Sequence, residues 1–291
     1  MNKKIYALGF FDGVHLGHQA LLSACVRLAK QENAIPAAVT FDLPPGTVLQ
    51  NQQPNMLTTV QDRKALLTHY GMEEILLFKA TAKQFSTPWQ EFLERLVNMG
   101  AAGFVCGADY RFGHKGEGNG EKLAQFSASL GLSCVIVSEQ SMDEEKISST
   151  RIRRCLEAGD IASANRLLGH PHIFTGTVVS GQQLGRTIGI PTANLQLPEA
   201  LLTPAFGVYA CTAHVDGHSY VAVTNIGTRP TVDGKGITVE PWLLDFDGDL
   251  YGKELTLKFH KFLRPEQKFD SLEALKNQIQ LDAAEAYQLL K

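Results

Sequence analysis

The hydrophobic pattern of the chain changes near residue 170, and this change constrains the fold more than any other feature. Before it, short apolar runs alternate with segments of helical periodicity. The runs cover residues 5–9, 37–41, 75–78, 103–106 and 134–137. Apolar runs of this length between helices are typical of buried strands in a parallel sheet. Residues 1–170 therefore predict an α/β domain built on a parallel sheet.

After residue 170 the pattern changes to β-branched and aromatic residues that alternate with polar residues and are interrupted by glycine. Residues 208–215 and 219–224 predict two strands of a hairpin, with a tight turn at Asp216 and Gly217. Helical spacing returns over residues 271–290. We therefore expect residues 171–291 to form a small antiparallel β-barrel with a terminal helix, and residues 160–168 to form a connecting helix.

Composition narrows the class of protein. The chain has 291 residues, enough for two domains with separate cores, and its 44% hydrophobic and 20% charged residues are ordinary for a globular protein without a membrane segment. A net charge of −3 without a basic tract argues against a nucleic-acid partner. Five widely spaced cysteines indicate reduced thiols in a cytoplasmic protein. The sequence does not exclude weak self-association of the protein.

His15 and His18 lie at the turn between the first predicted strand and the helix after it. Free backbone N–H groups and the macrodipole attract phosphate at a helix N-terminus. Gly17 lets a ligand approach the backbone, and Asp12 with Gly13 favours a tight turn after the strand. The pattern indicates a phosphate-binding site, although a pair of surface histidines or a zinc-binding pair also fits this spacing.

A second candidate anion site lies at residues 147–154. Serine and threonine at this position favour the start of a helix, and the arginines follow one turn inside it. An ordinary capped helix with a solvated basic face is the alternative interpretation. The two candidate sites together are more informative than either one alone.

The order of motifs along nearly the whole chain resembles that of the bacterial bifunctional riboflavin kinase/FAD synthetase family. The first half contributes residues 9–18, 107–113 and 147–153; the second half contributes residues 176–181, 185–194, 207–210, 225–231, 244–246, 249–252 and 262–269. The resemblance implies a Rossmann-like nucleotidylyltransferase domain followed by a riboflavin kinase barrel. It also implies ATP, riboflavin and FMN as substrates, FAD as a product and Mg²⁺ as the metal.

In the first domain, the resemblance implies transfer of an adenylyl group from ATP to FMN. The catalytic residues that it implies there are His15, His18 and Arg153, and the binding residues are Gly9, Asp12, Gly17, Asp109, Ser149 and Thr150. The chain departs from the family where a polar residue usually stands between two prolines, since it has Leu43 followed by Pro44 and Pro45. This departure lowers the expected efficiency of adenylyl transfer.

In the second domain, the resemblance implies phosphorylation of riboflavin. It assigns Glu240 as the catalytic carboxylate, Thr192 and Asn194 as ligands of Mg²⁺ and ATP, and Gly176, Gly189 and Arg264 as further binding residues. Pro241 and Trp242 follow Glu240 where the family commonly has a β-branched residue and a histidine. Because proline lacks the N–H that a strand donates, we expect an edge strand or a bulge here.

The leading hypothesis is an enzyme that carries out both reactions at separate sites. One alternative is that one activity has weakened or been lost, which would leave a kinase or an adenylyltransferase. Another is a flavin-binding or flavin-sensing protein without turnover. The presence of the expected groups in both halves favours catalysis over sensing.

Overall fold

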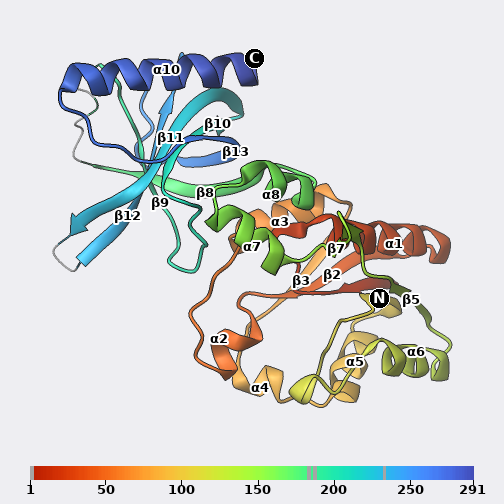
Figure 1. The fold of residues 1–291 in the computed structure, drawn as a ribbon. Helices are drawn as coiled ribbons and strands as arrows, with labels where there is room; N and C mark the ends of the chain where they lie inside the picture. The colour runs from red at the N-terminus through yellow and green to blue at the C-terminus, as the bar shows by residue number, and fades with distance from the viewer. Residues whose placement is uncertain (1–2, 182–184, 186–188, 232–233) are drawn as a thin grey trace. The chain divides into compact units, whose positions relative to one another are not determined.

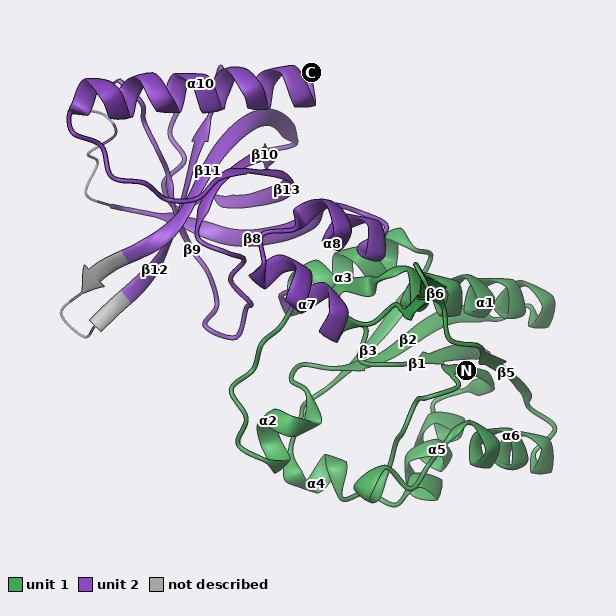
Figure 2. Ribbon diagram, in the orientation of Figure 1, with its two compact units in different colours: residues 1–56, 60–149 green, residues 57–59, 150–291 purple. Residues whose placement is uncertain are grey.

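A computed structural model describes residues 3–181, 185, 189–231 and 234–291 of the protein (Figure 1). Its contacts divide the chain into two compact units, which Figure 2 colours separately. Unit 1 comprises residues 1–56 and 60–149, and unit 2 comprises residues 57–59 and 150–291.

The contacts divide the chain before the predicted boundary at residue 170, because helix α8 (Ile161–Leu168) packs on the strands of unit 2. Asn165 of this helix donates from Nδ2 to the carbonyl oxygen of Phe259 at 2.8 Å and accepts from the backbone N–H of His172 at 2.8 Å. That the two activities divide at residue 170 stays a prediction.

Unit 1 contains a five-stranded parallel sheet with the strand order β3-β2-β1-β4-β5. Its strands are β1 (Lys4–Leu8), β2 (Ile35–Phe41), β3 (Glu74–Phe78), β4 (Ala101–Gly107) and β5 (Ser133–Val137). Each of the five predicted apolar runs forms one of these strands, so the predicted parallel α/β fold is confirmed.

Helices cover both faces of this sheet, because the strands are continuous apolar runs with apolar side chains on both faces. In β1, Ile5 and Ala7 pack with α1, whereas Tyr6 and Leu8 pack on the opposite face with residues of α5. The remaining elements of unit 1 are η1 (Asp12–Val14), α1 (Leu16–Glu32), α2 (Pro45–Leu49), α3 (Val60–His69), α4 (Ala82–Phe85), α5 (Trp89–Asn98), η2 (His114–Gly116), α6 (Gly120–Ser129), β6 (Ser141–Met142) and β7 (Glu145–Lys146).

The strand order places a topological switch point between β1 and β4. From β1 the chain continues to β2 and β3 on one side, and it returns to β4 and β5 on the other. In open α/β sheets, ligands bind in the crevice at the carboxyl ends of the two strands where the order reverses. The segments that leave β1 and β4 are therefore the expected place for a binding site.

Unit 2 contains a six-stranded antiparallel sheet with the order β12-β11-β10-β13-β8-β9. Its elements are α7 (Ser149–Glu157), whose first residue belongs to unit 1, α8, β8 (His172–Val179), β9 (Asn194–Gln196), β10 (Gly207–Val215), β11 (His218–Thr231), β12 (Gly234–Leu243), β13 (Glu254–Arg264) and α10 (Leu272–Leu290). The two ends of the sheet approach each other, since the N–H of Ala193 donates to the carbonyl oxygen of Pro241 at 2.9 Å. The predicted hairpin, near-barrel and terminal helix are confirmed. No helix in the described ranges is long and apolar enough to cross a membrane.

Pro241 lies in the edge strand β12, as the sequence predicts. The expected alternative, a bulge, is wrong: β12 pairs with β11 in one continuous register from Leu243 to Gly234. Pro241 is tolerated because its missing N–H would face the edge, while its carbonyl oxygen still accepts from Ala193. Glu240, the predicted catalytic carboxylate, therefore lies in a regular strand.

Candidate active sites

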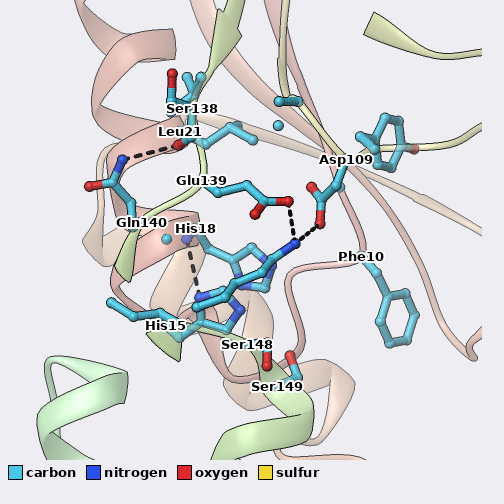
Figure 3. A pocket seen from close by; sticks show the side chains of 18 of the residues that line it. Phe10, His15, His18, Leu21, Asp109, Ser138, Glu139, Gln140, Ser148 and Ser149 are labelled. Atoms are coloured by element: carbon cyan, nitrogen blue, oxygen red, sulfur yellow. Dashed lines mark hydrogen bonds and ion pairs between the residues drawn. The ribbon is translucent and has the colours of Figure 1, made fainter. Parts of the chain in front are cut away.

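A cavity of about 340 Å³ lies at the switch point of unit 1. Its walls come from the segments after β1 and β4, the start of α1 and residues 137–140 and 146–149 (Figure 3). The predicted residues that line it are Gly9, His15, Gly17, His18, Asp109 and Ser149. The structure thus brings the histidine pair and the start of the second anion segment together at one cavity.

Three other predicted residues of the first domain do not line this cavity. Asp12 is 1% exposed, and its carbonyl oxygen accepts a hydrogen bond of 3.0 Å from Ser149 Oγ. Thr150 and Arg153 follow on α7 and belong to unit 2; Thr150 is exposed and Arg153 is half-buried. Their roles toward a nucleotide stay predictions.

His15 and His18 form a stacked pair at the start of α1. Their ring centroids are 3.7 Å apart with an interplanar angle of 15°, and His15 Nδ1 accepts from the backbone N–H of His18 at 3.4 Å. Burial lowers the pKa of His18 well below its usual value, and the nearby charges of His15 and Arg63 lower it further. His18 is therefore a neutral imidazole near pH 7, which can donate one ring N–H but carries no positive charge.

The sequence left two alternatives for the histidine pair, namely surface histidines and a zinc-binding pair. A pair of surface histidines is wrong for His15, whose exposure is only 7%. Within the described ranges, no three His, Cys, Asp or Glu side chains lie close enough together to hold a metal ion.

Arg63 is a functional candidate that sequence reasoning missed. It is fully buried, donates from Nη1 to the carbonyl oxygen of Phe10 at 2.9 Å and stacks over the Phe10 ring at 4.6 Å. Burial lowers the pKa of Arg63, while the carboxylates of Asp12 and Asp42 act in the opposite direction. Arg63 therefore holds the segment between β1 and η1 from behind the cavity. In sequence it resembles an ordinary basic residue on a helix surface.

Lys146 is a second residue that sequence reasoning missed. Its Nζ atom lies 2.5 Å from Asp109 Oδ2 and 2.6 Å from Glu139 Oε1, and Figure 3 shows both carboxylates directed at this one nitrogen. The hydrogen bond with Asp109 is the largest cause of the raised pKa of Lys146, followed by the hydrogen bond with Glu139. The ammonium group thus stays protonated at the wall of the cavity. The sequence offered one indication of this role, because Lys146 directly precedes the second candidate anion segment, residues 147–154.

A second cavity in unit 1, of about 540 Å³, has aromatic walls. It shares Phe10, Tyr110 and Arg111 with the first cavity, so the two adjoin. Its other lining residues include Phe41, Pro45, Leu49, Phe85, Phe92, Phe112 and Lys115. Pro45 belongs to the segment in which the sequence departs from the family that it resembles, and that segment contributes an apolar wall. Sequence reasoning did not predict this cavity, because its residues come from five separate segments.

The cavity of unit 2 follows from the register of the antiparallel strands. Asn225 pairs with Glu240 and with Val208, and Val208 pairs with Arg264. These four side chains therefore form one row across four strands, on one face of the sheet. A stripe of α10 lies opposite this face, at Leu272, Leu275, Ile279 and Asp282. Between them is a cavity of about 540 Å³.

Three of the predicted residues of the second domain line this cavity: Thr192, Glu240 and Arg264. Asn225 is a further polar residue there, and sequence reasoning left its role unassigned although it faces Glu240 across the strand pair. The hydrogen bond from Ala193 to Pro241 holds the segment with Thr192 beside β12.

The remaining predicted residues of this domain do not line the cavity. Gly176 lies where β8 approaches β9 closely, because a Cβ atom there would overlap the carbonyl oxygen of Gln196. Gly189 has a φ of +76°, which favours glycine. Asn194 pairs with Val179 in the sheet. Roles for Gly176, Gly189 and Asn194 in binding stay predictions.

Arg264 has a partner that the sequence did not reveal. Its guanidinium group donates to the carboxylate of Asp282 from Nη2 at 2.8 Å and from Nε at 3.0 Å, and Gln278 donates to the same carboxylate at 3.0 Å. Asp282 is 3% exposed. The pair joins β13 to α10 at the wall of the cavity, so Arg264 positions the helix as well as lining the site.

Comparison with known proteins divides the chain in the same way. The family model for FAD synthetase matches residues 1–151, and the family model for riboflavin kinase matches residues 168–290. Two curated relatives are described as bifunctional riboflavin kinase/FMN adenylyltransferases. The protein from Listeria monocytogenes is 38% identical over 96% of this chain and 90% of its own length, and the protein from Bacillus subtilis is 34% identical over 98% and 92%.

A solved structure is similar over almost the whole chain. It is the crystal structure of a protein from Streptococcus pneumoniae, described as a macrolide-efflux protein, with a TM-score of 0.89 and 32% sequence identity. The similarity covers 98% of this chain and 94% of that chain. The two proteins therefore share their fold along both units.

Proposed function

Because the chain belongs to the family of bifunctional riboflavin kinases/FMN adenylyltransferases, we propose that it phosphorylates riboflavin in unit 2 and adenylylates FMN in unit 1. Both reactions use ATP. The observation that carries the proposal is that each unit has its own cavity, and that each cavity is lined by groups suited to its reaction: His15 and His18 in one, Glu240 and Thr192 in the other.

In adenylyl transfer, a phosphate oxygen of FMN attacks the α-phosphorus of ATP and pyrophosphate leaves. The protein must bind and orient the triphosphate and stabilise the negative charge of the transition state. The N-terminus of α1 supplies backbone N–H groups, His18 supplies a neutral ring N–H, and Lys146 supplies a positive charge. Ser149 lines the cavity beside them, and its hydroxyl group donates to the carbonyl oxygen of Asp12.

The aromatic cavity of unit 1 suits the flat ring system of FMN. It adjoins the phosphate cavity through Phe10, Tyr110 and Arg111. A ring between the aromatic walls would place the FMN phosphate at this junction, where Arg111 can pair with it.

In the kinase reaction, the terminal hydroxyl of riboflavin attacks the γ-phosphorus of ATP and ADP leaves. Glu240 is the proposed base, because its carboxylate lies in the polar row of the cavity and can accept the hydroxyl proton. Asn225, its cross-strand partner, is positioned to orient the same hydroxyl.

The donor set also fits the Mg²⁺ that accompanies ATP. The Thr192 hydroxyl lines the same cavity, and a hard oxygen ligand of this kind suits Mg²⁺. When bound, the ion neutralises charge on the phosphates. Asn194 as a ligand, a cytoplasmic location, weak self-association and the absence of a nucleic-acid partner remain predictions.

The test is a time course of the purified protein with riboflavin, ATP and Mg²⁺, in which riboflavin, FMN and FAD are separated by chromatography. The proposal expects FMN to form first and FAD to follow. Accumulation of FMN alone would contradict the role of unit 1, and bound but unchanged riboflavin would favour a flavin sensor.

A further inference from the structure

Trp242 lies at the border of the unit 2 cavity, and the proposed reaction gives it no role. It follows Glu240 by two residues, so both side chains lie on the same face of β12. Trp242 pairs with Val223, and Val223 pairs with Ala210. An apolar row of three residues thus runs beside the polar row that contains Glu240.

Trp242 also lines a second cavity of about 450 Å³ between the end of β12 and α10, in addition to the unit 2 cavity. The side chain packs against the buried cluster that contains Val223 and Ala283. This packing supports the ring at the border of the unit 2 cavity.

We propose that the indole of Trp242 stacks on the isoalloxazine ring of riboflavin and so positions this substrate in the kinase site. The inference rests on the proposed kinase function of unit 2. Indole is electron-rich and isoalloxazine is electron-poor and flat, so offset stacking adds to the gain from burying the two rings.

The spacing along β12 supports this placement. Two residues of a strand span about 6.8 Å, which is comparable with the length of a short polyol chain. A ring against Trp242 therefore directs the polyol chain along the strand, and its terminal hydroxyl reaches Glu240. The apolar row with Trp242 thus binds the flavin ring, and the neighbouring polar row with Glu240 accepts the proton.

The test uses a spectroscopic signal that requires contact between the two rings. Riboflavin is added to the protein without ATP, and flavin emission and long-wavelength absorption are recorded. Stacking on indole quenches the emission and adds a charge-transfer band. Trp89, the other tryptophan of the chain, packs near Phe126 in unit 1 and serves as the matched position.

We expect the natural protein and W89F to show the band and the quenching, and W242F to lose the band. In the kinase reaction, W242A should raise the KM for riboflavin roughly two- to tenfold, and W242F should raise it less because it keeps an aromatic ring. Formation of FAD from FMN in unit 1 should be unchanged in W242A and W242F, and a kcat close to natural in the kinase reaction shows that unit 2 of these variants is folded.

The inference is overturned if W242F keeps the band, or if the natural protein forms FMN while its bound riboflavin shows neither band nor quenching. An unchanged KM for riboflavin in W242A would also overturn it. If W242A does not fold, the spectra of W242F decide. Failure of the natural protein to form FMN would instead contradict the proposed function.

Discussion

The two cavities that we propose for the binding and transfer of phosphate groups are built from different parts of the polypeptide. In unit 1 the site lies at the ends of parallel strands and at the N-terminus of α1, so backbone N–H groups and the loops that follow the strands line it. In unit 2 the site lies on the face of an antiparallel sheet, and its side chains come from four strands. The first site depends on a local turn, and the second depends on strand register.

This difference predicts where each site is sensitive. A change in the buried surroundings of the first turn, at Arg63 or Asp12, should disturb the site of unit 1. In unit 2, a slip of one residue in β12 would move Glu240 to the opposite face. The hydrogen bond between Ala193 and Pro241 and the ion pair between Arg264 and Asp282 hold that arrangement.

The largest expected effect is on the kinase reaction. Glu240→Gln removes the proposed base while it keeps the size of the side chain, so FMN formation should fall by about 10²- to 10⁴-fold. FAD formation from FMN should be unchanged. Initial rates of both reactions check this, and Glu199→Gln at an exposed position is the control. Equal losses in both reactions would contradict separate sites.

The converse variant tests unit 1. His18→Ala removes a donor to the triphosphate, and FAD formation should fall by about 10²- to 10³-fold while FMN formation is retained. His69, which is exposed, provides the matched control in His69→Ala. A normal rate of FAD formation in His18→Ala would exclude His18 from the site.

The next effect concerns stability. Arg63→Met leaves the buried carboxylate of Asp12 and the half-buried carboxylate of Asp42 without a nearby countercharge, so the free energy of unfolding of unit 1 should fall by about 3 kcal/mol. Arg95→Met, at an exposed arginine over Phe78, should cost less than about 1 kcal/mol. Urea unfolding measures both, and similar losses would show that burial of Arg63 is not the cause.

A pH effect is expected in unit 2. Burial lowers the pKa of His172 to about 3 from the ordinary value of 6.5. Between these pH values the unfolded chain binds a proton that the folded chain does not, so the free energy of unfolding should fall as the pH drops from 6.5 towards 3. The slope approaches about 1.4 kcal/mol per pH unit in the middle of the window.

His172→Phe should flatten this slope, because the buried ring then no longer titrates. His218→Phe, at an exposed position of unit 2, should leave the slope unchanged. Urea midpoints at several pH values provide the measurement, and an unchanged slope in His172→Phe would assign the pH dependence to other groups.

The smallest effect is expected at Lys146. Its ion pairs are partly exposed and contribute little to stability, so Lys146→Met should change the free energy of unfolding by less than about 0.5 kcal/mol. The rate of FAD formation should fall by roughly tenfold, because a positive charge beside the triphosphate is lost. Lys253→Met, which breaks an exposed ion pair with Asp216 in unit 2, should leave FAD formation unchanged.

The sequence predicted unit 1 better than it predicted the details of either site. Apolar runs and contiguous motifs depend on neighbouring residues, so the strands and the turn at His15 and His18 could be found directly. Arg63 could not, because its burial results from tertiary packing around Phe10 and Asp12. Lys146 was missed because its partners, Asp109 and Glu139, come from other segments.

In unit 2, the strands and the hairpin were predictable from alternation, but the cavity was not. The row that joins Arg264, Val208, Asn225 and Glu240 exists only when three strand pairs adopt their registers. The partner of Arg264 lies on α10, at Asp282, and no sequence spacing indicates it. Pro241 was predictable as an edge residue because its effect on the strand is local.

The most direct test of two separate sites mixes two variants that each lack one activity. Glu240→Gln and His18→Ala are combined in equal amounts with riboflavin, ATP and Mg²⁺, and the three flavins are followed by chromatography. The account predicts that the mixture forms FAD after FMN has accumulated, whereas Glu240→Gln alone forms almost no FMN and His18→Ala alone stops at FMN. If the mixture forms FMN but no FAD, or if either variant alone has lost both reactions, independent sites are contradicted.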